Sequence, residues 1–214
     1  MRMRSRTTLG ILLIIGGILS LLQTLNILQG QLSDTIWGVL FGAAGLYFIL
    51  MFVRNSGTWW PIIPGAILLS LAVVSLSSLF LGGVLSDIEG LIILGSLGLS
   101  FLLIFLTNRV QWWAVIPGGV LLTVGVISWI DETGAAGVGS ETVLFLGLGL
   151  TFLLLYLVPT PVGRIGWAIF PAAALLLVGA FVGYADNEVV GKILGPAGIL
   201  LAGLVLLVSS LRKG

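Results

Sequence analysis

The stretch that decides the fold is WWPIIPGAILL, residues 59–69. Two related stretches follow it, WWAVIPGGVLL at 112–122 and GWAIFPAAALL at 166–176. Their shared prolines recur at intervals of 53 and 54 residues, at Pro64, Pro117 and Pro171. A fixed period of this length indicates tandem structural repeats. In each repeat, an entry containing tryptophan and proline leads into an apolar helix.

A second motif, Gly-Leu-x-Phe followed by apolar residues, precedes each of these stretches and begins at Gly45, Gly98 and Gly149. The first repeat is degenerate at its entry, where Gly16-Gly17-Ile18-Leu19 stands in place of Pro-Gly, and the fourth is looser around 198–201. Each unit therefore consists of a helix, an acidic turn, a returning helix and a basic turn.

The composition places these helices in a membrane. Of 214 residues, 58% are hydrophobic and 8% are charged, and the mean hydropathy is +1.24, whereas soluble domains are roughly a quarter charged. A bilayer core of about 30 Å needs about 20 apolar residues in a helix. This window predicts eight spans, the first of them an uncleaved N-terminal helix: 8–28, 36–53, 60–81, 91–107, 113–130, 142–158, 165–182 and 193–211.

The charges alternate along this map. Eight of the nine basic residues fall at the termini or after even-numbered spans: Arg2, Arg4, Arg6, Arg54, Arg109, Arg164, Arg212 and Lys213. All eight acidic residues fall after odd-numbered spans: Asp34, Asp87, Glu89, Asp131, Glu132, Glu141, Asp186 and Glu188. Lys192 is the exception. Since cytoplasmic loops retain lysine and arginine, both termini are predicted to be cytoplasmic.

The predicted fold is an all-α integral membrane protein. Its eight transmembrane helices form four tandem hairpins, which are parallel repeats related by an axis near the membrane normal. We expect one polytopic domain, 1–214, packed as a compact bundle. Its approximate repeats are 8–55, 56–109, 110–164 and 165–214.

Several classes of function are excluded or disfavoured by composition. The chain has no cysteine and no histidine, so disulfides, thiolate nucleophiles and imidazole chemistry are absent. No ionisable residue is predicted in the middle of a span, which argues against a proton-coupled carrier. The glycine-rich segments lack the strand and lysine of a phosphate loop. Scattered hydroxyls such as Ser70, Ser100 and Thr123 are predicted to bond between helices, and we expect no catalytic residue, metal ion or cofactor.

The tryptophans and prolines of the motif have two interpretations each. Trp59, Trp60, Trp112, Trp113 and Trp167 lie at the cytoplasmic starts of predicted spans, where an aromatic belt at the lipid headgroups is favoured over a stacking platform for a ligand. The repeat prolines lie about one turn inside the spans, where they would either tilt each helix for packing or gate it. Their repetition favours the tilt.

The Trp-Trp-Pro-Ile-Ile-Pro-Gly run and the returning helix with Gly-Leu-x-Phe-Leu-Leu resemble the LiaI/LiaF-like transmembrane region of bacteria. That resemblance implies tandem membrane hairpins and a role in envelope-stress sensing or one not known. The regulator proteins of that family carry a soluble C-terminal domain, which is not seen after Arg212-Lys213. The resemblance therefore bears on fold and bacterial membrane location more than on regulation.

The leading hypothesis is a non-enzymatic structural or accessory protein of a bacterial cytoplasmic membrane. Its partners would be the lipid bilayer and either other membrane subunits or further copies of itself, and not nucleic acid. The alternative is a channel or facilitator for a small neutral or lipidic molecule, in which four hairpins surround a pore. A third hypothesis, a lipid-modifying enzyme using Asp131 or Glu132, lacks a nucleophile–base pair.

Overall fold

The computed structural model describes residues 30–186 except 55–56, 81–84, 135–136, 138 and 162, together with 14, 16–18, 20–25, 196–201 and 203. All named elements in this part of the chain are helical. Those elements are α2 (Gln31–Arg54), α3 (Ile62–Phe80), η1 (Ser86–Ile88), α4 (Glu89–Thr107), η2 (Trp112–Ala114), α5 (Val115–Thr133), α6 (Ser140–Leu157), η3 (Gly166–Ala168) and α7 (Ile169–Asp186).

Each of the six predicted spans between residues 36 and 182 coincides with one of these helices. Five helical stretches are long and apolar enough to cross a membrane, whereas the apolar part of α3, Ile62–Ser77, is shorter. The protein is thus an all-helical membrane protein. About half of the predicted span 8–28 and most of 193–211 lie outside the described residues, and both termini lie wholly outside them.

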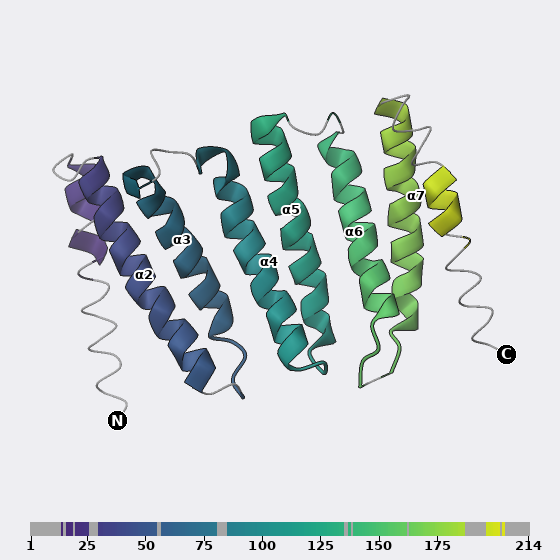
Figure 1. Ribbon diagram of the computed structural model, residues 1–214, viewed down its shortest axis with the longest axis horizontal. Coiled ribbons are helices and arrows are strands. Elements are labelled where there is room, and N and C mark those ends of the chain that lie inside the picture. Colours follow the sequence, from purple (N-terminus) through teal and green to yellow (C-terminus); the bar gives the residue numbers. More distant parts are fainter. Residues whose placement is uncertain are drawn as a thin grey trace.

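The helices form a single row (Figure 1). They stand side by side in chain order, and every extensive contact between α-helices joins two that are consecutive in the chain. The described helices are therefore arranged as an open layer, which differs from the compact bundle that was predicted. A physical reason is that lipid tails are as apolar as leucine, so no hydrophobic force closes the row on itself.

Glycines bring α2 close to α3, α4 to α5, and α6 to α7, the three pairs with the most extensive contacts. The glycine of each Gly-Leu-x-Phe motif faces a leucine of the next helix, five positions after the repeat proline. An added Cβ at Gly45 would lie 2.9 Å from the side chain of Leu69, and one at Gly98 would lie 2.8 Å from that of Leu122. Gly149 faces Leu176 in the same way.

These close pairs are offset by one helix from the predicted repeats. The predicted units 56–109 and 110–164 pair α3 with α4 and α5 with α6, whereas the tighter seams join the last helix of one unit to the first of the next. The sequence period identifies equivalent positions, but it does not determine which neighbouring helices pack most closely.

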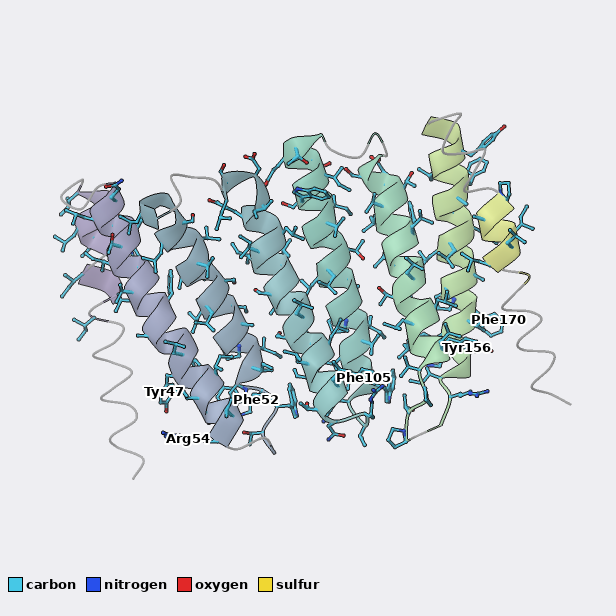
Figure 2. All side chains as sticks on the ribbon, in the orientation of Figure 1. Tyr47, Phe52, Arg54, Phe105, Tyr156 and Phe170 are labelled. Atoms are coloured by element: carbon cyan, nitrogen blue, oxygen red, sulfur yellow. The ribbon has the colours of Figure 1, made fainter. Side chains whose placement is uncertain are left out.

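The buried core lies along one edge of the row, where one set of helix ends comes together. Its nine residues come from the starts of α3, α5 and α7 or the turns before them, and from the ends of α4 and α6: Ile62, Ile104, Phe105, Ala114, Val115, Leu155, Tyr156, Ile165 and Ala168. Phe105 and Tyr156 are labelled at the lower end in Figure 2, on the same side as Arg54. Figure 1 shows the helices drawing together towards this end. We call it the basic end.

Candidate functional site

An aromatic pair recurs three times at the basic end. The phenylalanine of each Gly-Leu-x-Phe motif meets, edge to face, the tryptophan four residues before the repeat proline. The ring centroids are 5.9 Å apart for Phe48 and Trp60, 6.1 Å for Phe101 and Trp113, and 6.0 Å for Phe152 and Trp167. Such pairs contribute about 0.5–1.5 kcal/mol beyond the burial of their area. Each pair therefore joins the end of one helix to the start of the next.

Of the five tryptophans identified in the sequence motif, Trp113 has the most ring and hydrogen-bond contacts. Its ring also meets Trp59 at 5.5 Å, and its Nε1 donates a hydrogen bond to Gln111 Oε1. Trp59, Trp112 and Trp113 all pack against the buried core. These three tryptophans therefore contribute to packing within the protein and are not only anchors at a membrane surface.

Trp60 and Trp167 are the outward members of the set, with exposed fractions of 46% and 51%. Their large exposed area at the ends of helices suits amphipathic indoles at a lipid headgroup layer. The five tryptophans therefore divide into a packed group and an outward group, which the sequence motif alone does not distinguish.

Pro64, Pro117 and Pro171 each occupy the third position of their α-helix. The first four N–H groups of a helix have no partner within it, so a proline costs no hydrogen bond there. In α5 and α7, the carbonyl that the proline leaves free accepts instead from the residue that starts the helix: Val115 N–H bonds to Trp113 O, and Ile169 N–H to Trp167 O. The prolines therefore lie nearer the helix start than predicted.

Positive and negative side chains lie at opposite ends of the helices. The described arginines, Arg54, Arg109 and Arg164, all lie in or beside the turns at the basic end and are exposed. Arg109 also lies over the Phe105 ring, with 4.7 Å from its Cζ to the centroid. The acidic residues with described side chains lie at the starts or ends of helices on the opposite side: Asp34, Asp87, Glu89, Asp131, Glu132 and Glu141. The described spans thus carry no charge midway.

The hydrogen bonds of the buried hydroxyls contradict one prediction. Ser70, Ser77 and Ser100 donate to carbonyls three residues earlier in their own helices. Thr123 and Thr151 donate to the carbonyls four residues earlier, at Gly119 and Gly147. These side chains therefore do not form the interhelical hydrogen bonds that were predicted, because the helix offers each a nearer acceptor.

The two threonines instead fit over glycines of the facing helix. An added Cβ at Gly119 would lie 2.1 Å from Thr151 Oγ1, and one at Gly147 would lie 2.3 Å from Thr123 Oγ1. This reciprocal contact brings α5 and α6 together through small residues, as is common in membrane helices.

Thr142 has the only buried side-chain oxygen or nitrogen without a hydrogen-bond partner in the described part of the chain. We expect Thr142→Val to raise the unfolding free energy by about 1 kcal/mol, since an unpaired buried polar group costs about 1–3 kcal/mol. Chemical unfolding in detergent micelles measures this. Thr151→Val is the matched control on the same helix, because it removes a satisfied hydroxyl. A gain equal to that of Thr142→Val in the control would contradict the explanation.

Two apolar grooves lie at equivalent positions in successive repeats. Groove A, of about 510 Å³, runs over α3 between α2 and α4. Groove B, of about 430 Å³, runs over α5 and is flanked by α4 and α6. Volumes of 300–1,000 Å³ are typical of sites that hold small molecules or side chains. The hydroxyls on the groove floors, Ser70 and Thr123, already donate within their own helices.

Sequence reasoning located the tryptophans and prolines but missed two parts of this arrangement. It did not assign Phe48, Phe101 and Phe152 as the partners of the tryptophans, although their fixed place in the Gly-Leu-x-Phe motif was a usable signal. It also missed the grooves, since no single stretch of sequence contains one. Within the described residues, no group of three or more histidine, cysteine or acidic side chains is placed to hold a metal ion.

Comparison with known proteins gives no relative. No family model, no curated protein and no solved structure matches the chain.

Proposed function

We propose that this protein is a non-enzymatic structural or accessory component of a bacterial cytoplasmic membrane, and that it acts by packing an open face of its helix row against other membrane protein. The observation that carries the proposal is the single layer. Only 11% to 33% of the residues in the five apolar windows are buried within the chain. The remaining surface is apolar and is free to contact lipid or protein.

The remaining parts of the proposal come from the sequence and from the contacts that recur between helices. Eight helices in four tandem hairpins, with both termini and the arginine-containing turns in the cytoplasm, account for the separation of charge. The recurrent Phe–Trp and Gly–Leu contacts support a repeated unit. The resemblance to the LiaI/LiaF-like region supports a bacterial membrane and a link to envelope stress.

A channel formed by one chain is less well supported. A pore through a helical protein needs helices on all its sides, whereas the named helices form an open row with α2 and α7 far apart on its left and right (Figure 1). The uncharged described spans also provide no ring of charged side chains of the kind that selects ions.

Gentle detergent extraction from native membranes, followed by native mass spectrometry, tests the proposal. The expected result is that the chain leaves the membrane in a defined assembly with other protein or with further copies of itself. A chain that travels alone, together with a solute flux into liposomes that depends on it, would overturn the proposal in favour of the channel.

A further inference from the structure

Groove B begins at the basic end and extends along the helices for about the depth of one lipid leaflet. Its lining residues on α5 run from Val115, the first residue of that helix, to Val126. Eleven residues of helix rise by about 16 Å, whereas one leaflet supplies about 15 Å of a hydrocarbon core of about 30 Å. The groove therefore matches the length of an acyl chain in the leaflet at the basic end.

The residues that line groove B suit a hydrocarbon chain. All of them are glycine, valine or leucine except Thr123 and Thr151. Both threonine hydroxyls donate to carbonyls four residues earlier in their own helices. An acyl chain can therefore occupy the groove without leaving a buried hydroxyl donor unpaired, which would cost free energy.

A positive charge lies where groove B reaches the basic end. On α4 the groove is lined by Leu102, and Phe105 lies one turn further along the same face of that helix. Phe105 packs in the buried core with Val115, the lining residue at the mouth of the groove. The Arg109 guanidinium lies over the Phe105 ring, with 4.7 Å from Cζ to the centroid. This contact holds the guanidinium beside the mouth of groove B.

Arg109 has no acidic partner among the described residues. The acidic residue of α4, Glu89, begins the helix eighteen residues before Thr107, a distance of about 27 Å along the helix. The other acidic residues with described side chains also lie at that opposite end. Arg109 is exposed, and the planar fork of a guanidinium matches a phosphate through two parallel hydrogen bonds. The charge at the mouth of groove B therefore complements an anionic headgroup.

Groove A lacks this arrangement, although it occupies the equivalent position in the preceding repeat. Its lining residue Phe52 is the counterpart of Phe105, and the counterpart of Arg109 is Ser56. The nearest arginine along the chain, Arg54, lies two residues after Phe52, and residues two apart on a helix do not share a face. Figure 2 shows Phe52 and Arg54 on opposite sides of the end of α2. The arginine at the mouth is therefore a property of groove B and does not follow from the repeat.

We infer that groove B binds an anionic phospholipid, with one acyl chain along the groove and the phosphate on the Arg109 guanidinium. Basic pockets between transmembrane helices are a recurrent site for anionic lipid headgroups. The lipid belongs to the leaflet at the basic end. The inference goes beyond the proposed function, since it names a small ligand and holds whichever protein packs against the rest of the row.

Lipid titration of the full-length chain in mild detergent, followed by native mass spectrometry, tests the headgroup contact. The probes are phosphatidylglycerol and phosphatidylcholine with the same acyl chains. The first phosphatidylglycerol is expected to bind the wild type about fivefold more tightly than the first phosphatidylcholine, the contribution of one arginine at an anionic lipid surface. We expect Arg109→Gln to remove this preference and Arg54→Gln, the matched control at the same end, to keep it. A wild type without the preference, or equal losses in the two variants, would overturn the inference.

A second variant tests whether the acyl chain lies in the groove. Val126→Trp places an indole in groove B, and Val124→Trp is the matched control, since Val124 is 37% exposed and lines neither groove. We expect Val126→Trp to weaken phosphatidylglycerol binding about tenfold, the effect of displacing about two buried methylene groups, and the control to bind as the wild type does. Equal binding by Val126→Trp and the wild type, or an equal loss in Val124→Trp, would overturn the inference. Arg109 is exposed and outside the groove packing, so the headgroup test stands even if Val126→Trp fails to fold.

Discussion

Replacing Trp113 by alanine is expected to lower the unfolding free energy by about 3–5 kcal/mol, the usual cost of truncating a well-packed tryptophan. Trp113 forms ring contacts with Phe101 and Trp59, donates a hydrogen bond to Gln111, and packs on the core. The measurement is chemical unfolding of the full chain in detergent micelles, followed by far-UV circular dichroism so that loss of one tryptophan does not alter the signal.

Trp167→Ala is the matched control for this prediction. Trp167 occupies the equivalent position four residues before its proline, but it is 51% exposed and has one ring contact, with Phe152. We expect a loss of about 1 kcal/mol, the size of one aromatic pair. Both tryptophans lie at the same end of the row, so a belt at the lipid surface would affect them equally. Equal losses would contradict the packing explanation.

The difference between these two tryptophans shows what the sequence can and cannot predict. The hydropathy window located the six helices from α2 to α7, because the length of an apolar run is a local property that the bilayer itself requires. The tryptophan motif likewise marked one end of the row. Whether a given indole is buried depends on the neighbouring helices, as with Trp59, which reaches Trp113 from a different helix start.

The open layer itself was not predictable from the same signals. In water, an amphipathic pattern indicates which face of a helix is covered, but the spans here are apolar on all sides, so the sequence does not distinguish a closed bundle from a row. The positions that determine the row are small residues in the seams, such as Gly119 and Gly147. Glycine is abundant throughout the chain, with 31 residues, so the sequence alone does not show which of them lie at contacts between helices.

Gly98→Ala is expected to destabilise the protein, because α4 and α5 approach each other at this residue. An added Cβ would lie 2.8 Å from the carbonyl oxygen of Gly118 and 3.0 Å from the backbone nitrogen of Leu122. Backbone atoms cannot rotate away as the end of a side chain can, so the two helices must separate. Overpacking of this kind costs about 1–3 kcal/mol.

Gly95→Ala provides the comparison that isolates this contact. Gly95 lies three residues earlier on the same helix, and its nearest neighbour to an added Cβ is the end of the Leu91 side chain at 3.8 Å, an ordinary contact. Alanine is favoured over glycine inside a helix by about 1 kcal/mol, and this gain is common to both variants. Thermal unfolding in detergent is therefore expected to show Gly95→Ala as stable as the wild type or more so, and Gly98→Ala less stable than Gly95→Ala by about 1–3 kcal/mol. If the two variants melt together, the helices can separate at Gly98 without cost, and the α4–α5 seam does not hold the row together.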